Sequence, residues 1–420
     1  MRLLKSLSVR VLLGLLLGLG VGALGAASGD ATVARVIEAV EAVGGLWLNA
    51  LRMTVVPLIF AILVTGIAQV SDAAATGRLA ARAIGWFFGL LLLACAFSLA
   101  FTHGLLALWP VSAEGAMALR AGAPPTGPEA VTPDFAAWIK GLAPSNPVKA
   151  AAEDAVLPLV VFAIFTGFAL TKLPAERGRT VIDVFQAIGE AMIVIVRWVL
   201  WAGPVGVFCL GLGVGLRAGV GAAGVLGHYV AVASAAGLGI TIIGYFLAVF
   251  VGRVPLGRWA RATAPVLAAA FATQSSLACL PAMIERTRDD LGVPQRIAGL
   301  VLPLAVAVFR FTSPVVNLAV AIFVAHIYGI DPTPLQFAGA VLVALAVSVG
   351  SVGLPGQVSF IISVAPICLA LGLPIELLPI LLAVEVVPDI FRTLGNVTGD
   401  MAVTAILARD EPNPPEPADA

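Results

Sequence analysis

Five charged or amide residues near the carboxyl end of the chain form one regular series, which we call the polar face. They are separated by four, three, four and four residues: Glu385, Asp389, Arg392, Asn396 and Asp400. On an α-helix this spacing places all five side chains along one side. Guanidinium and carboxylate groups arranged in this way either bind a small charged molecule or pair with one another to tie helices together. The spacing alone leaves both interpretations open.

The chain around the polar face is strongly apolar. Of its 420 residues, 60% are hydrophobic and 11% are charged, and the mean hydropathy is +1.04. Soluble domains average roughly half apolar residues, and about 20 such residues cross a ~30 Å hydrocarbon layer as a helix. We therefore predict an all-α polytopic membrane protein with eight transmembrane helices, near residues 9–27, 43–70, 83–109, 152–171, 179–213, 225–252, 297–328 and 375–408.

Two further apolar segments, at 263–284 and 335–371, are interrupted at their centres by small and turn-forming residues: Ser275 and Ser276 in the first, and Gly353, Pro355 and Gly356 in the second. Half of either segment is too short to cross the bilayer. We expect two re-entrant helical hairpins with tips at mid-depth, where irregular backbone must line a protein-enclosed cavity. Paired interrupted segments are typical of transporter sites built from inverted repeats. This pattern favours a transport site for the polar face.

Basic residues predict the orientation of the chain. Because cytoplasmic loops of membrane proteins are enriched in Lys and Arg, we expect both termini in the cytoplasm and the loop near 110–150 outside. The loops assigned to the inner side carry Arg78, Arg82, Lys172, Arg177, Arg179, Arg253, Arg258, Arg261, Arg286, Arg288, Arg296 and Arg409. The proline-rich tail, residues 409–420, cannot continue a helix and is expected to be disordered.

Other classes of protein fit the sequence less well. Ser275 and Ser276 have no histidine partner that the sequence reveals, and the three histidines and four cysteines are scattered singly, without metal-ligand spacing. We therefore predict neither an enzyme nor a bound cofactor. Basic and acidic residues are equal in number, at 24 each, and no motif indicates a nucleic-acid partner.

Two runs of residues carry a resemblance to a known family. These two runs are Arg392-Thr-Leu-Gly-Asn-Val-Thr-Gly-Asp400 and the small-residue run 348–356. Weaker similarity lies at residues 53–57, 145–147 and 203–208. Through these runs the whole chain resembles the dicarboxylate/amino acid:cation symporters, the glutamate transporter family. The resemblance implies a glutamate-transporter-like fold, assembled as a homotrimer among the lipids of a bacterial inner membrane.

The resemblance also implies a division of labour along the chain. Residues 1–252 would be mainly a scaffold and trimerisation region, although their third and sixth helices would move with the transport unit. Residues 253–408 would form a transport core of two hairpins and the last two helices. In an elevator-type mechanism this core moves across the membrane while the scaffold stays fixed.

The same resemblance assigns roles within the site. Arg392 would bind a side-chain carboxylate of the substrate, Asp389 its ammonium group, and Asn396 with the hairpin tips its α-carboxylate, while Asp400 would lie at a cation site. Further substrate-binding residues would be Thr393, Ser275, Ser276, Ser313, Gly353, Pro355 and Gly356. Arginine suits a carboxylate and Asp389 an ammonium, so we expect glutamate or aspartate as substrate. A C4-dicarboxylate symporter and a non-transporting ligand-binding sensor are the alternatives.

The chain departs from the family at its sodium-binding motifs. The family's seventh helix is broken at Asn-Met-Asp-Gly-Thr, whereas this chain has Phe309-Arg-Phe-Thr-Ser313. The third helix has Phe87-Phe-Gly-Leu-Leu91 where the family places a tyrosine and a Thr-Ser pair. Gln274 and Leu277 stand where many members have an arginine and a serine, and Glu385 replaces an aspartate. Sodium sites are therefore doubtful in this chain.

The charges of the polar face make these departures informative. It carries three carboxylates and one guanidinium, and an anionic substrate adds further negative charge. A low-dielectric cavity holds that excess only when cations or protons enter as well. We hypothesise that Arg310, paired with Glu385 or Asp400, replaces a bound cation, so that sodium dependence is altered or absent. Any remaining coupling would use protons, with Glu385 as the first candidate carrier. Asp400 and Asn396 complete the set of residues expected to take part in coupling to a cation or proton. Alternatively, Arg310 extends to a membrane interface without a functional partner.

Overall fold

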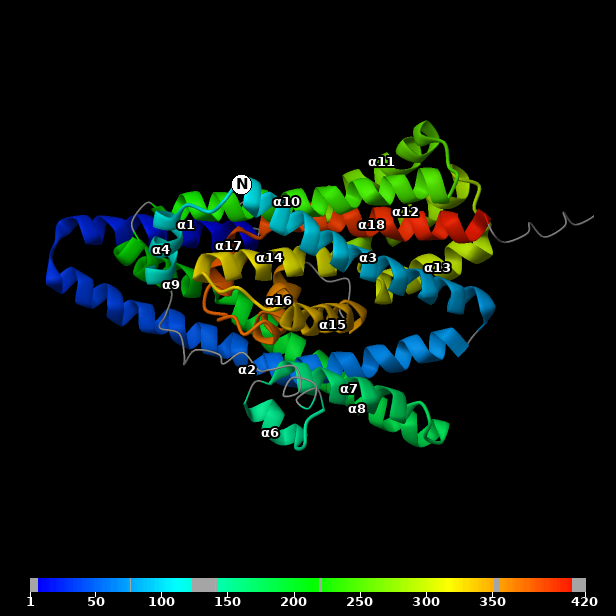
Figure 1. The fold of residues 1–420 in the computed structure, drawn as a ribbon, viewed down its shortest axis with the longest axis horizontal. Helices are drawn as coiled ribbons and strands as arrows, with labels where there is room; N and C mark the ends of the chain where they lie inside the picture. Colours follow the sequence, from blue (N-terminus) through cyan, green and yellow to red (C-terminus); the bar gives the residue numbers. More distant parts are fainter. Residues whose placement is uncertain are drawn as a thin grey trace, which may run out of the picture.

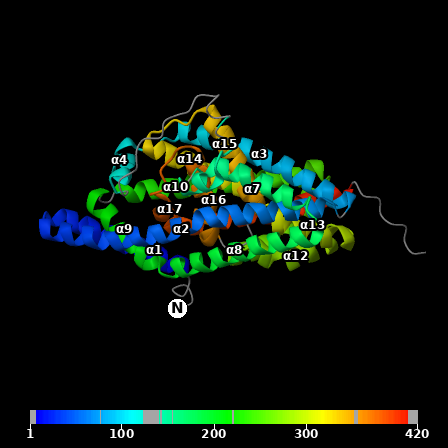
Figure 2. The ribbon, with the colours of Figure 1, turned by 90° about the horizontal axis from the view of Figure 1, so that it is seen from below.

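The structure, a computed structural model, describes residues 7–75, 77–122, 140, 143–153, 155–218, 221–350 and 356–409. These residues form helices and turns, with no β-strand among them, and most of the long helices run along one axis of the molecule (Figures 1 and 2). Five segments of this described part are long and apolar enough to cross a membrane. The all-α prediction is thereby confirmed, whereas the eight membrane spans and the two re-entrant hairpins stay predictions.

The first half of the chain forms helices of very different length, from the 6 residues of α6 to the 45 residues of α2. Their bounds are α1 (Leu7–Ser28), α2 (Ala31–Ala75), α3 (Arg78–Leu108), α4 (Ala113–Gly122), α6 (Pro147–Ala152), α7 (Val156–Leu170), α8 (Ala175–Trp201), α9 (Gly203–Ala218), α10 (Gly221–Phe246) and the π-helical turn η2 (Leu247–Val251). The span expected over 179–213 is two successive helices, because α8 ends before the Gly203-Pro204 pair.

Glycines bring α1 and α9 into close contact. Gly18 and Gly22 of α1 face Gly211 and Gly215 of α9. A Cβ atom on Gly22 would lie 2.2 Å from the carbonyl oxygen of Leu212, so a larger residue there would push the helices apart. Small residues at four-residue spacing are how helices approach closely in membranes, where lipid offers no hydrophobic drive for association.

The second half of the chain repeats one order of elements: a helix pair, then an interrupted helix. The first unit is α11 (Leu256–Thr273) and α12 (Ser276–Asp289), followed by α13 (Gln295–Val308) and α14 (Ser313–Tyr328). The second unit is α15 (Pro334–Gly350) and α16 (Gly356–Ala370), followed by α17 (Leu378–Val384) and α18 (Val386–Arg409). In both units the helices of the pair pack against each other.

The first helix pair is a hairpin with a tight turn at Gln274 and Ser275. Gln274 adopts a left-handed conformation, with φ of 50°, which ends α11. The side chain of Ser275 then accepts a hydrogen bond from the backbone N–H of Ala278 and caps α12. A helix stop followed directly by a serine cap reverses the chain. The expected tip of the second hairpin, including Gly353 and Pro355, lies outside the described residues; Gly356 begins α16.

The packing separates two groups of helices. α2 packs against α7, α8 and α9, whereas α18 packs against α10, α11, α12 and α13 and lies alongside α10 in Figure 1. Two clusters of buried apolar side chains follow this grouping in part, and α3, α10, α14 and α15 contribute to both. α18 therefore lies inside the second group, surrounded by protein along its length. The division into a fixed scaffold and a moving core stays a prediction.

Candidate functional site

The polar face is buried. Its five side chains are between 0 and 4% exposed, and four of them lie on α18. Glu385 stands one residue before α18, at the junction with α17. The series is therefore interrupted at its first member, since Glu385 caps the end of α17 instead of continuing one regular helix. Its carboxylate is still directed toward the rest of the polar face.

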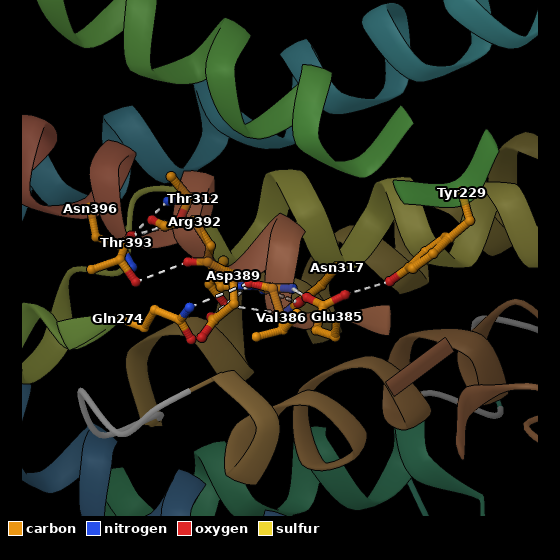
Figure 3. Close-up of polar contacts among 11 residues, drawn as sticks. Tyr229, Gln274, Thr312, Asn317, Glu385, Val386, Asp389, Arg392, Thr393 and Asn396 are labelled. Carbon is orange, nitrogen blue, oxygen red and sulfur yellow. Dashed lines mark hydrogen bonds and ion pairs between the residues drawn. The ribbon is translucent and has the colours of Figure 1, made fainter. Parts of the chain in front are cut away.

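Arg392 is at the centre of a hydrogen-bonded network (Figure 3). Its Nη2 donates to Oε1 of Glu385 at 2.7 Å, and its Nη1 donates to Oδ1 of Asn317 on α14 at 2.6 Å. The hydroxyl of Tyr229 on α10 donates to the other oxygen of Glu385 at 2.5 Å. Asn317 in turn donates to Oγ of Ser313 at 3.1 Å. The network joins three segments that are distant in sequence and holds the guanidinium in one orientation.

Asn396 fixes the break between α13 and α14. Its Oδ1 accepts hydrogen bonds from the backbone N–H and from the hydroxyl of Thr312, at 2.9 and 2.8 Å. The same hydroxyl lies 2.7 Å from the backbone carbonyl oxygen of Arg392. The interruption of the helix frees backbone groups, and buried backbone groups need partners. Asn396 supplies one, so in this conformation its side chain is a structural anchor for the break.

Glycines on α18 allow the break to lie close to the helix. A Cβ atom on Gly395 would lie 2.3 Å from Cγ2 of Thr312, and one on Gly399 would lie 2.7 Å from the ring of Phe311. Any larger residue at either position would collide with the break. This close approach places the unwound segment next to Asn396 and Asp400.

Asp389 and the tip of the first hairpin lie at one end of the polar face. Oδ1 of Asp389 is 3.8 Å from Nε of Arg392, one helical turn away. Nε2 of Gln274, at the hairpin tip, donates to the backbone carbonyl of Val386 at 3.4 Å (Figure 3). Thr393 donates its hydroxyl to the carbonyl of Asp389 at 3.0 Å. The structure therefore brings the first tip to the start of α18, where Asp389 lies.

Asp400 and Arg310 are two buried charges near the helix break. Both side chains are buried, and the Arg310 guanidinium interacts electrostatically with the carboxylates of Asp400 and Asp389. Neither oxygen of Asp400 has a hydrogen-bond partner among the described residues. Arg310 is 6% exposed, so it does not extend to a membrane interface. Of the two partners expected for Arg310, Asp400 interacts with it electrostatically, whereas Glu385 is bonded to Arg392 and Tyr229.

The aromatic departures from the family motifs contact one another. The ring of Phe87 on α3 stacks on Phe309 with centroids 4.6 Å apart and planes 9° apart. Phe309 also contacts Phe311, with centroids 5.6 Å apart. All three rings are buried. The two segments that depart from the family motifs, one on α3 and one at the helix break, thus form a single apolar cluster. Two of its rings, Phe309 and Phe311, are the sequence neighbours of Arg310.

Three members of the site were not assigned a role from the sequence. Tyr229 and Asn317 bind the ends of the Glu385–Arg392 pair, and Thr312 binds Asn396. Tyr229 is one of only three tyrosines, and Asn317 is an amide within a long apolar run. Both are polar groups in segments otherwise suited to lipid or core, and such groups need a buried partner. That signal could have identified both as candidates, although not their partners.

Other predicted residues are placed less centrally. Ser275 caps α12 at the hairpin tip and Ser276 is buried behind it. Ser313 bonds Asn317 and so contacts the network through one intermediate. Gly353 and Pro355 are outside the described residues, so their predicted role in substrate binding stays a prediction.

The fold and site together define a class of protein. Membrane-length helices enclose a buried set of charges, a helical hairpin reaches it, and two interrupted helices provide the backbone groups around it. This combination is typical of a secondary transporter with its site inside the membrane.

Comparison with known proteins gives the family. Residues 7–410 match the sodium:dicarboxylate symporter family, and the chain belongs to it. It is similar to neutral amino acid transporter A of Homo sapiens, at 31% identity over 87% of this chain and 74% of the relative. It is also similar to the proton/glutamate-aspartate symporter of Escherichia coli (strain K12), at 28% identity over 97% and 93%. The proton/sodium-glutamate symport protein of Geobacillus stearothermophilus is 27% identical over 96% and 94%.

Family membership settles several expectations. The resemblance drawn from the run that ends at Asp400 is confirmed. The chain is an integral membrane protein of a transporter family, and the interpretation as a transporter instead of an enzyme is confirmed by that membership.

Proposed function

We propose that this chain is a secondary active transporter of an acidic amino acid, glutamate or aspartate. One observation carries the proposal: Arg392 and Asp389 lie one turn apart in a buried site, 3.8 Å from each other, beside a hairpin tip. A cation and an anion at this separation suit a ligand that carries both a carboxylate and an ammonium group. The relatives that are named as glutamate symporters support this substrate class.

The guanidinium of Arg392 keeps capacity for a ligand. Its bonds to Glu385 and Asn317 use two of its five N–H donors, and its Nε has no hydrogen-bond partner among the described residues. A substrate carboxylate would accept from Nε while the ammonium group of the same substrate binds Asp389, which lies 3.8 Å from that nitrogen. A C4-dicarboxylate has no ammonium group for Asp389, so it fits the same place less well.

A neutral amino acid is the second candidate. Glu385 is only 2.7 Å from the guanidinium of Arg392 and already neutralises it. In a buried site an ion pair of this kind competes with an incoming carboxylate. The neutral amino acid transporters among the relatives agree with this alternative. A Glu385–Arg392 pair that persists in the bound state would exclude the second carboxylate of glutamate.

We further propose that transport does not depend on sodium. The Phe87–Phe309–Phe311 cluster fills with aromatic rings the region where sodium would need oxygen ligands. Arg310 adds a permanent positive charge near Asp400 and Asp389. Hard cations bind oxygen atoms, and apolar rings offer none. The charge that a sodium ion would bring is thus already present in the protein.

Protons are the remaining candidate for coupling, and the geometry favours Asp400 over Glu385. Both oxygens of Glu385 accept hydrogen bonds, from Arg392 and Tyr229. Asp400 accepts none from the described residues. A buried carboxylate without donors is costly in its charged form. Protonation therefore removes a larger desolvation free energy at Asp400 than at Glu385.

The larger-scale expectations complete the proposal. The family is consistent with eight membrane spans, two re-entrant hairpins and both termini in the cytoplasm. It is also consistent with a homotrimer and with an elevator-type movement of residues 253–408. The packing of α18 against α11, α12 and α13 supports a core that moves as one unit, and α15 and α16 contact α2 as well.

The test is uptake into vesicles that contain the purified protein. Aspartate, glutamate, serine and succinate are compared, each with sodium or choline outside and at two pH values. We expect saturable uptake of the acidic amino acids that is unchanged when choline replaces sodium. Serine uptake without aspartate uptake would favour the second candidate. Binding of aspartate without any flux would identify a sensor.

A further inference from the structure

A basic pocket lies at the end of the molecule where α18 finishes. It is a cavity of about 270 Å³ lined by residues of the η2–α11 loop, of the α12–α13 turn and of the last turn of α18: Gly252, Arg253, Val254, Pro255, Arg258, Leu291, Gly292, Val293, Pro294, Ala405, Ala408 and Arg409. The end of α18 and the start of α13 lie together in Figures 1 and 2. The transport site does not use this pocket.

Three arginines give the pocket its charge. Nε of Arg258 donates to the carbonyl of Asp290 at 2.6 Å, and Nη1 of Arg409 donates to the carbonyl of Val251 at 2.6 Å. These bonds fix the positions of the two guanidinium groups, and Arg258 keeps N–H donors beyond the one that binds Asp290. Arg253 lines the same cavity from the loop. The arrangement suits an anion with several oxygen acceptors.

Nearby acidic side chains are engaged by other arginines. Asp289 is 2.6 Å from Arg288, and Asp290 and Glu285 are 3.5 and 3.0 Å from Arg286. All of these pairs belong to α12 and its end, and none involves an arginine of the basic pocket. Among the described residues of α12 and its end, these side-chain ion pairs therefore leave the pocket arginines to other partners.

Two helices also begin at the basic pocket. α11 follows Pro255 and α13 follows Pro294, and both prolines line the cavity. Neither helix start has a side-chain cap or an acidic residue in its first turn. The first N–H groups of a helix carry partial positive charge and favour an anion. Both helix starts add to the field of the three arginines.

Arg253 has an unusual backbone conformation for an arginine. Its φ is 56°, in the left-handed region that glycine adopts most easily. Strained residues of this kind concentrate at binding sites, where the side chain is needed despite the cost. Replacement of Arg253 by glycine would therefore remove the charge and also relieve the backbone.

An apolar groove is lined by the same chain segment as the basic pocket. It is a cavity of about 500 Å³ whose lining residues are Leu238, Thr241, Ile242, Tyr245, Phe246, Val249, Phe250, Leu256, Leu267 and Leu394. The two hydroxyls in this lining are bonded to protein, Thr241 to Gly237 at 2.7 Å and Tyr245 to Thr263 at 2.9 Å. Phe250 and Leu256 flank the loop that lines the basic pocket, so one segment forms a wall of both.

We propose that an anionic phospholipid binds across these two sites, with its phosphate in the basic pocket and an acyl chain in the apolar groove. The charge of the pocket selects the anion, and the groove selects a ligand with a hydrocarbon chain. Basic pockets beside membrane helices are where anionic headgroups bind. Because Leu394 of the groove and Arg409 of the pocket both belong to α18, the lipid contacts the helix that carries the transport site.

The test uses the full chain in a mild detergent, with binding of phosphatidylglycerol measured by native mass spectrometry. Phosphatidylcholine is the uncharged control lipid, and inorganic phosphate is the competitor. We expect Arg253→Gly to weaken phosphatidylglycerol binding about fivefold, since one arginine near an anionic lipid contributes roughly that factor. Its thermal stability without lipid should be equal to or higher than that of the wild type. Arg288→Gln, an exposed arginine outside the pocket, should leave binding unchanged.

A second variant separates lipid from free phosphate. Ile242→Trp fills the groove without touching the basic pocket, so it should weaken phosphatidylglycerol and leave phosphate unaffected; Leu92→Trp on α3 is the matched control. Equal binding of the two lipids would overturn the proposal, as would equal losses in Arg253→Gly and Arg288→Gln. Phosphate competition combined with normal lipid binding by Ile242→Trp would identify a site for free phosphate instead.

Discussion

Oε1 of Glu385 lies 2.7 Å from Nη2 of Arg392, across the junction that separates α17 from α18. The two residues are seven positions apart, and the hydroxyl of Tyr229 binds the other oxygen of the glutamate at 2.5 Å. This relationship holds the arginine that we assign to the substrate. A substrate carboxylate that binds Arg392 must also compete with this ion pair for the guanidinium.

Arg392→Ala is expected to abolish binding of aspartate and glutamate. The substitution also leaves Glu385 buried without its ionic partner, which costs about 3–5 kcal/mol of stability. Arg392→Lys keeps the positive charge and loses the planar fork, so it should fold and bind acidic ligands about tenfold or more weakly. Titration calorimetry of both variants measures this. Unchanged aspartate affinity in either one would show that the anion binds elsewhere.

Tyr229→Phe is expected to weaken substrate binding with little change in fold. It removes one hydroxyl that donates to a buried carboxylate, a bond that contributes about 1.5–3 kcal/mol. Glu385 would then be held by Arg392 alone and would compete more strongly for the guanidinium. Tyr245→Phe is the control, because its hydroxyl bonds Thr263 far from the network. An equal change in both variants would contradict a specific role for Tyr229.

Thr312→Val is expected to destabilise the helix break. Valine keeps the shape of threonine and loses the hydroxyl that bonds Asn396 and the carbonyl of Arg392, at a cost of about 1–3 kcal/mol. The measurement is the thermal unfolding midpoint of the purified protein. Thr398→Val is the matched control, since its hydroxyl bonds only a carbonyl of its own helix, that of Leu394. If the two variants unfold at the same temperature, the bond across the break has no special weight.

Arg310→Met is expected to reduce transport about tenfold or more, because Asp400 loses its nearby positive charge. Asp400→Asn in the same chain should restore part of the exchange of substrate across the membrane, since the uncompensated carboxylate is then absent, but not the proton coupling that we assign to Asp400. Uptake by the single and double variants, with sodium or choline, measures the coupling between the two residues. Independent, additive losses would contradict the proposed pairing, and strict sodium dependence of the wild type would contradict the substitute-cation hypothesis.

Much of the site could be predicted from the sequence, because its signal is local. Four of the five residues of the polar face lie on one helix, where spacing alone determines which side they occupy. The tight turn at Gln274 and Ser275 was likewise predictable, since small and polar residues interrupt an apolar segment there. The sequence also shows directly that phenylalanines occupy positions 87 and 309, where the family motifs have polar residues. These replacements indicated a site with fewer oxygen ligands.

The partners of these residues could not be predicted in the same way. Tyr229 and Asn317 bind Glu385 and Arg392 from helices 156 and 75 positions away in the chain. The stacking of Phe87 on Phe309, and the bonding of Glu385 to Arg392 instead of Arg310, depend on how helices pack.

By itself the sequence determined the membrane environment, the helical class, the family and the identity of the charged residues, because composition and periodic spacing act within single segments. Only the tertiary structure decided which charges neutralise one another and which carboxylate is left without a donor. The physical reason is that a buried charge takes its energy from the groups that surround it in space, and those groups come from segments whose mutual placement no local pattern records.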